Sequence, residues 1–456
     1  MMKMSKYHYS ELEKQINKVL AYNSEKASDI CTIDLARTDK NIKESELLLA
    51  SLGYRIPEKV SKVDKKHKPV LVVKSWESLC VEAEKAISGE VALEDLFTES
   101  ELKENRAELK KINDEFKFIY KLDKYDISIC AVAALVGALI DIVLVGIPQK
   151  GYDGIKGGTL SNYIRDYFEK QYPDEDMQKL ANSKISKVPY DAQDNRNTTI
   201  NVEGLSAYYH RIVSLGHDPL LGFVFGVLDI LNGTMTTIDK NGKFVSQLME
   251  NYADRTEIDI VKALIKQINH LKSDINTSMG LPAPLMSLFN LLQLGSIGEY
   301  EQTIADIVQG MYAEGYDFIH FCSMSVPVMI TELIIRIGYS LKRIKEGYSV
   351  KESIPFSGNN NKHPKLGTML FIGHAGCSAI NAGKVYFTKN PMAINYPQWI
   401  AFAKYSYTEL RWGLIQKPAI KKAYIDGRIN EELDDVFKSI DESFDSLSED
   451  YIVVFE

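Results

Sequence analysis

Three histidines and two aspartates in the middle of the chain have the residue types and spacing of metal ligands. His210 and His217 are seven positions apart, about two helical turns, and Asp218 follows directly. His270 and Asp274 are four positions apart, which places them on one face of a helix. Neutral imidazoles and carboxylates from two helices suit zinc or another divalent cation. One interpretation is therefore a metal-dependent hydrolase.

The first of these segments also fits an ordinary helix start. Gly216 and Pro219 interrupt any continuous helix through His217, and the chain has no H-E-x-x-H motif. An aspartate followed by proline and an apolar run is typical of a helix N-terminus, where the carboxylate accepts hydrogen bonds from the next amides. We favour this cap for Asp218. We accordingly expect no cofactor, and a divalent metal only in the alternative interpretation.

A second set of ionisable residues lies in segments that are otherwise apolar. They are Asp141, His320, Glu332, Arg336 and His374. A buried charge is costly without partners or water, so such residues typically line a polar path or an interhelical network. Glu332 and Arg336 are four positions apart and should pair on one helical face. The alternatives are a hydrogen-bonded core acid at Asp141 and a buried, hydrogen-bonded imidazole at His374, which lies between glycines.

The segment that carries Asp141 is the best candidate for a membrane span. Residues 127–147 contain only this one charged residue. A helix of about 20 residues, rising about 1.5 Å per residue, crosses a hydrocarbon core of ~30 Å. Lysines precede the segment, and positive residues beside a span favour the cytoplasmic side. The alternative is a buried central helix of a large soluble domain.

Later apolar segments are shorter or interrupted. They are residues 220–231, 281–294, 318–341 and 366–382, and each contains Pro, Gly, His or an acid. Broken apolar helices with ionisable residues occur in membranes mainly where they face protein or a water-filled cavity. Of these segments, 318–341 is long enough to span. The pattern predicts a membrane-associated helical bundle.

The two ends of the chain differ from this apolar half. Residues 1–125 are rich in Lys and Glu, with apolar residues at helical spacing, which predicts a cytoplasmic helical domain. Residues 426–456 contain 11 acids and two bases, a net charge of −9, whereas the net charge of the whole chain is −8. The excess negative charge therefore lies in this C-terminal segment. The N-terminus lacks an apolar signal region, and the five dispersed cysteines favour a reducing compartment. P-loop and G-x-S-x-G motifs are absent, which disfavours an NTPase and a serine hydrolase.

Several short motifs of the apolar half resemble a family of poorly characterised bacterial membrane-associated proteins, in which an Asp-bearing Gly/Ala helix also comes first. The motifs are Tyr209-His210-Arg211, Ser214-Leu215-Gly216-His217-Asp218-Pro219-Leu220-Leu221-Gly222, His270-x-x-x-Asp274, Gly280-Leu281-Pro282-Ala283-Pro284 and Gly315-Tyr316-Asp317-Phe318. The resemblance covers roughly residues 125–415. It implies a defence effector that opens an ion path, like the transmembrane effector of the Hailong anti-phage system, and it assigns no site residue.

Together these patterns predict a mainly α-helical protein in three parts: a cytoplasmic helical domain (1–125), a membrane-embedded or membrane-associated bundle (126–425) and an acidic segment (426–456). The expected function is a non-enzymatic membrane effector or ion channel in the bacterial inner membrane. The alternatives are the metal-dependent hydrolase and a soluble helical scaffold. We expect a homo-oligomer in contact with membrane lipid, because one full span and several broken ones cannot enclose a pore. The acidic tail is a candidate surface for a partner protein, and local clusters of Lys and Arg leave a nucleotide or oligonucleotide regulator open.

Overall fold

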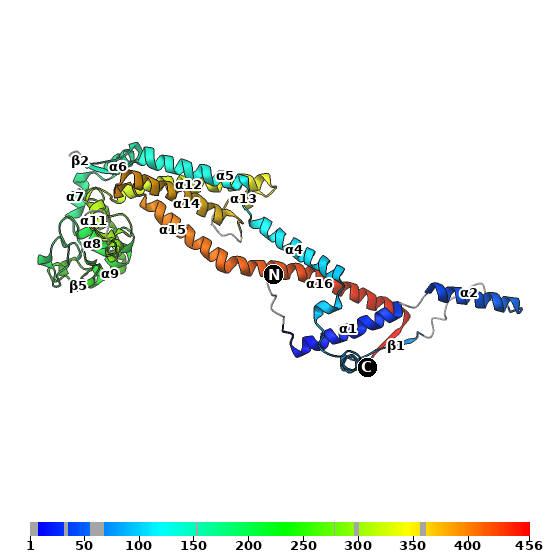
Figure 1. The fold of residues 1–456 in the computed structure, drawn as a ribbon. Coiled ribbons are helices and arrows are strands. Elements are labelled where there is room, and N and C mark those ends of the chain that lie inside the picture. Colours follow the sequence, from blue (N-terminus) through cyan, green and yellow to red (C-terminus); the bar gives the residue numbers. More distant parts are fainter. Residues whose placement is uncertain are drawn as a thin grey trace. The chain divides into compact units, whose positions relative to one another are not determined.

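The computed structural model describes residues 8–31, 35–54, 68–151, 154–277, 279–295, 301–355 and 362–456. These residues are mainly helical, as the sequence predicts, and also form three two-stranded sheets (Figure 1). By internal contacts the chain divides into two units. One comprises Met1–Phe118 with Pro418–Glu456, and the other is Ile119–Lys417. The acidic residues 426–456 thus belong to the same unit as the N-terminal part of the chain. The boundary between that N-terminal part and the second unit follows Phe118.

The unit that holds both chain ends consists of helices and one small sheet. Its helices are α1 (Glu11–Cys31), α2 (Leu35–Ser51), α3 (Trp76–Ala86), most of α4 (Glu99–Tyr120) and nearly all of α16 (Lys417–Asp450). Helices α1 and α3 pack together, and Phe116 of α4 lies against the ring of Tyr424 of α16. Strand β1 (Val70–Val73) pairs in parallel with β6 (Ile452–Phe455). The apolar end of the acidic tail is therefore paired within this unit.

Four helices of the second unit form a bundle (Figure 1). They are α5 (Lys124–Leu139), α12 (Phe318–Lys345), α14 (Leu366–Thr388) and α15 (Tyr396–Arg411). Small residues let α5 approach its neighbours closely: a Cβ added to Gly137 would lie 2.1 Å from Thr331 Oγ1 of α12. The buried centre of the bundle contains apolar residues of all four helices, including Ala133, Ile335 and Leu370.

The outer faces of this bundle are apolar. Val132, Leu135 and Leu139 of α5 are more than half exposed, as are Met329, Leu333 and Leu341 of α12. By length and composition, two helices among the described residues can cross a membrane, Glu99–Val145 and Phe318–Lys345. The predicted span, residues 127–147, lies in α5 (Lys124–Leu139) and in the π-helical turn that follows it, Ile140–Val145. The most apolar window of Glu99–Val145 is 33% buried.

A lobe of shorter elements adjoins one end of the bundle in the same unit (Figure 1). Its helices are α6 (Thr159–Gln171), α7 (Asp174–Ala181), α8 (His210–Val213), α9 (Phe225–Asn232), α10 (Ile260–Asp274) and α11 (Ile304–Ala313). Its strands are the antiparallel pairs β2 (Gln149–Gly151) with β3 (Gly154–Lys156) and β4 (Thr234–Ile238) with β5 (Phe244–Leu248). Helix α13 (Val350–Ser353) lies on α12. The lobe contains the larger apolar core, into which the fully buried Tyr190 and Tyr312 pack.

Candidate metal centre

Four segments of the lobe bring three histidines and two aspartates together. His210 begins α8, and His217 ends the 3₁₀ turn Leu215–His217 that follows. His270 and Asp274 lie in the last turns of α10, whose first turn is capped by a hydrogen bond from the Lys262 amide to the Asp259 carboxylate. The fifth residue is Asp191, which lies in the chain between α7 and α8. The i, i+4 spacing of α10 thus supplies two neighbouring groups.

The donor atoms form two overlapping triads. Asp191, His210 and His217 make one triad, His217, His270 and Asp274 make the other, and within each triad the donor atoms lie within 4.8 Å of one another. Asp191 Oδ1 is 3.9 Å from His210 Nε2 and 3.8 Å from His217 Nε2. Asp274 Oδ2 is 3.6 Å from His270 Nε2 and 4.0 Å from His217 Nε2. These distances are too long for hydrogen bonds but suit ligands that each lie ~2.1 Å from a shared ion.

Several of these atoms are buried without any hydrogen-bond partner. They are both ring nitrogens of His217, Nε2 of His270 and Oδ2 of Asp274. A buried polar group left unpaired costs about 1–3 kcal/mol, so several in one place need a common explanation. His210 fits the same explanation, because its Nδ1 lies 3.0 Å from the Ala207 carbonyl oxygen. A carbonyl only accepts, so Nδ1 carries the proton and Nε2 keeps its lone pair for a metal.

The ionisation states also suit metal binding. Burial lowers the pKa of His217 to about 3. Burial, with the charge of Arg211, also lowers the pKa of His210. Both imidazoles are therefore neutral at physiological pH, which is the form that binds metals.

Neighbouring side chains hold the ligands in place. Arg211 Nη2 donates to Asp274 Oδ1 at 3.0 Å, which leaves Asp274 Oδ2 directed at the histidines. The ring of Tyr190 contacts the His217 and His270 rings edge to face, with centroids 5.1 and 5.4 Å away. Gly216 is required beside it, because an added Cβ would lie 2.6 Å from the Tyr190 ring. These contacts fix the imidazoles before any ligand binds.

The structure separates the predicted ligands into two groups. It brings His210, His217, His270 and Asp274 together, but Asp218 accepts hydrogen bonds from the Leu220 and Leu221 amides, both at 2.9 Å. Asp218 Oδ1 thus caps the amides that follow, as the cap interpretation predicts, while Asp218 Oδ2 is buried without a hydrogen-bond partner. The described triads do not include Asp218. Sequence reasoning missed Asp191, which lies in a polar stretch without helical or strand periodicity. The sequence shows only an aspartate after a tyrosine, and the burial of Tyr190 is known from the tertiary structure alone.

Asp141 lies in an interhelical hydrogen-bond network. Its Oδ1 accepts from Asn395 Nδ2 at 2.7 Å. Its Oδ2 accepts from Lys384 Nζ at 3.0 Å and from Asn381 Nδ2 at 3.2 Å. Every partner comes from α14 or the start of α15, so the carboxylate joins the end of α5 to both helices.

The same network reaches one further predicted path residue. The Gln398 amide donates to Asn395 Oδ1 at 3.0 Å, and Gln398 Nε2 lies 3.1 Å from His374 Nδ1. The cavity beside Asp141, Asn395 and Gln398 measures about 10 Å³, room for a single water molecule. Asp141, Asn395 and Gln398 are thus hydrogen-bonded within this network, whereas His374 Nε2 is buried without a hydrogen-bond partner.

The other predicted path residues lie apart from this network. Arg336 Nε is 3.5 Å from Glu332 Oε2, as their spacing predicts, and Arg336 also donates to the Pro355 carbonyl at 3.0 Å. Both side chains are partly exposed. His320 is buried against the Tyr316 ring, and its Nε2 has no hydrogen-bond partner. The structure therefore does not bring the five residues into one polar path.

Comparison with known proteins does not assign a class to this site. No protein-family model, no curated protein and no solved structure matches the chain. The resemblance to bacterial membrane-associated defence proteins stays a prediction.

Proposed function

We propose that this chain is a membrane-associated, metal-dependent hydrolase whose centre consists of Asp191, His210, His217, His270 and Asp274. The observation that carries the proposal is the convergence of buried donor atoms without hydrogen-bond partners. Such atoms are costly unless something binds them, and a divalent cation satisfies imidazole and carboxylate groups together. Three imidazoles and two carboxylates suit Zn²⁺, Mn²⁺ or Fe²⁺.

The surroundings of the centre are compatible with hydrolysis. A divalent ion held there would polarise a substrate oxygen and lower the pKa of a water molecule. The side chain of Asp191 is 33% exposed to solvent, whereas that of His217 is fully buried. One edge of the cluster is therefore open to solvent. Arg211 is held by Asp274 and by the Gly280 carbonyl at 3.0 Å, which makes it a residue that orients Asp274.

Membrane association is supported by the surface of the same unit. Besides α5 and α12, helix α10 has an inverted pattern, with polar residues buried and aliphatic residues exposed. The buried polar residues are Lys266, Gln267, His270, Ser273 and Asp274, beside the apolar Ala263 and Leu271, and the exposed aliphatic residues are Ile260, Val261, Leu264, Ile265 and Ile268. Exposed apolar surface of this extent is typical of a site that meets lipid or a partner. The helix that supplies two ligands thus turns an aliphatic face outward.

The ion channel and the anti-phage role remain predictions that rank below the hydrolase. Asp141 pairs with Lys384 and Asn395, and the cavity beside Asp141 has a volume of about 10 Å³. A conducting path would have to form between chains. Membrane insertion without flux, together with a metal-dependent activity, would favour the hydrolase.

The proposal is tested on the full chain purified from membranes in detergent. We expect about one or two divalent ions per chain by elemental mass spectrometry. We also expect hydrolysis of an activated phosphodiester or carboxylic ester that a chelator abolishes and the metal restores. His217→Ala and Asp191→Asn should each lose metal and activity together.

Two matched controls separate metal loss from a general effect of the substitutions. His8→Ala changes an exposed histidine, and Asp218→Asn changes an acid directly beside His217 but outside the described triads. Both should keep the metal. Wild-type protein that is folded, binds none of the divalent metals in titration calorimetry and shows no hydrolysis would overturn the proposal.

A further inference from the structure

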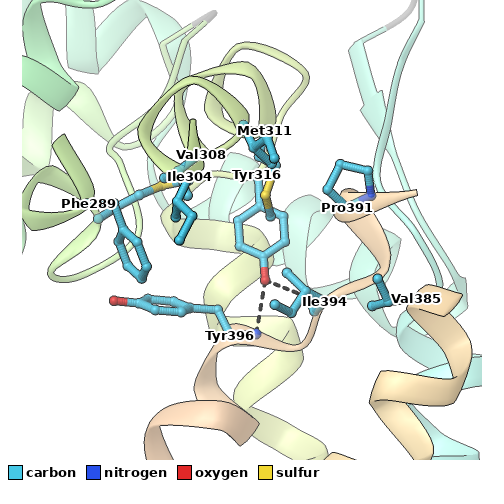
Figure 2. A pocket seen from close by; sticks show the side chains of 11 residues that line it. Phe289, Ile304, Val308, Met311, Tyr316, Val385, Pro391, Ile394 and Tyr396 are labelled. Atoms are coloured by element: carbon cyan, nitrogen blue, oxygen red, sulfur yellow. Dashed lines mark hydrogen bonds between the residues drawn. The ribbon is translucent and has the colours of Figure 1, made fainter. Parts of the chain in front are cut away.

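A pocket in the second unit is lined only by apolar and aromatic side chains (Figure 2). Its volume is about 230 Å³. The walls come from the lobe and from the adjoining end of the bundle. They are Met286, Phe289, Ile304, Ile307, Val308, Met311, Tyr316, Val385, Pro391, Ile394 and Tyr396.

The two phenol groups in the wall have protein partners. The Tyr316 hydroxyl donates to the Ile394 carbonyl at 2.6 Å and accepts from the Tyr396 amide at 3.0 Å (Figure 2). The Tyr396 hydroxyl donates to the Pro284 carbonyl at 3.1 Å. Water needs two to four polar partners, and cavities with only hydrocarbon walls stay dry and bind apolar molecules. The pocket therefore favours a hydrocarbon ligand.

The place of the pocket indicates where such a ligand comes from. Val385 belongs to the last turns of α14, and Tyr396 begins α15, so the pocket lies at the lobe end of the bundle. The bundle contains α5 and α12, whose outer faces are aliphatic and exposed. Lipid chains are the apolar molecules that contact such faces.

We propose that this pocket binds the hydrocarbon chain of a lipid. Its volume of about 230 Å³ has room for several carbons of such a chain. The proposal does not rest on the metal centre, although α11 connects the two sites. Met311 lines the pocket, while the next residue, Tyr312, donates to the Gly280 carbonyl at 2.9 Å, which also accepts from Arg211.

The experiment uses the full chain in lipid nanodiscs and two photoactivatable probes. One probe is a fatty acid with a diazirine on its chain, and the other is a phosphatidylcholine with the same acyl chain. Crosslinked peptides identified by mass spectrometry should concentrate in residues 286–311 and 385–396. Labelling by the fatty acid alone would assign the pocket to free fatty acid, and labelling by both would assign it to lipid chains in general.

Two variants that introduce the same side chain test the location. Val308→Trp fills the pocket and should lower its labelling about tenfold or more. Ile337→Trp adds the same side chain to the exposed face of α12 and should leave the labelling unchanged. Val308→Trp should keep the metal content of the wild type, so its failure is separable from that of the metal centre. Equal labelling of the two variants, or labelling confined to the outer bundle, would overturn the proposal.

A measurement on the wild type covers the case in which Val308→Trp does not fold. Competition by unlabelled fatty acids should strengthen about fourfold for each methylene added, until the chain exceeds the length of the pocket. Affinity that is independent of chain length would contradict a hydrocarbon site of this size.

Discussion

The bundle and the lobe each bury a group of polar side chains, but the two groups differ in how their hydrogen bonds are satisfied. In the bundle, Asp141 accepts from Lys384, Asn381 and Asn395. In the lobe, Asp274 Oδ2 and His217 have no such partners. A satisfied network holds helices together, whereas a convergent set of unsatisfied donors is arranged for a ligand. The unpaired atoms, more than the residue types, distinguish a structural cluster from a binding site.

The largest effect should come from breaking the satisfied network. Lys384→Met leaves the Asp141 carboxylate buried without its cation, and the loss of one partner of a buried ion pair costs roughly 3–5 kcal/mol of unfolding free energy. Thermal unfolding of the detergent-solubilised chain measures this. Lys351→Met, at an exposed site on α13, is the control. The double variant with Asp141→Asn should recover most of the loss, and a single variant as stable as the wild type would show that the network is not structural.

Metal should stabilise the lobe and leave the bundle network unaffected. A ligand at 100 times its Kd raises the free energy of unfolding by about 2.7 kcal/mol. We expect a rise of this size when Zn²⁺ is added to metal-free wild type, and none for His217→Ala. Asp141→Asn changes the other cluster and should respond like the wild type. An equal response in His217→Ala would place the ion elsewhere.

Acid should destabilise the metal-free lobe through His217. The unfolded histidine binds a proton below pH ~6.5, while burial lowers the folded pKa to about 3. The stability is therefore complete above pH ~6.5 and falls as the pH falls toward 3, by roughly 2 kcal/mol at pH 5. Denaturant unfolding of the metal-free wild type and of His217→Asn should show this difference. Identical pH profiles would mean that His217 is not held neutral.

The smallest effect should distinguish Asp218 from the true ligands. Asp218→Ala removes a helix cap and should cost about 1 kcal/mol while the metal content stays at the wild-type value. Asp191→Ala should do the reverse, with metal lost at little cost to the stability of the metal-free chain. Elemental analysis and thermal unfolding on the same preparations separate the two. Metal loss in Asp218→Ala would return this residue to the ligand set.

Local sequence patterns were sufficient for much of the helical structure. Apolar spacing predicted helices in residues 1–125, where α1, α3 and α4 lie, and the i, i+4 rule placed His270 beside Asp274 and Glu332 beside Arg336. The signature at Asp218 predicted its cap. Each of these depends on residues within about one helical turn, where backbone geometry alone determines which side chains are neighbours.

By itself, then, the sequence determined the helical class, the apolar segments and the neighbours within one turn, and the tertiary structure decided which polar groups meet. Asp191 joins His217 only because the buried Tyr190 packs against Gly216, and Asp141 meets Lys384 from 243 positions away. The aliphatic face of α10 is likewise exposed because its polar face is the one that packs into the lobe. Contacts between distant segments depend on how whole elements pack, and the periodicity of a single segment does not specify its partner.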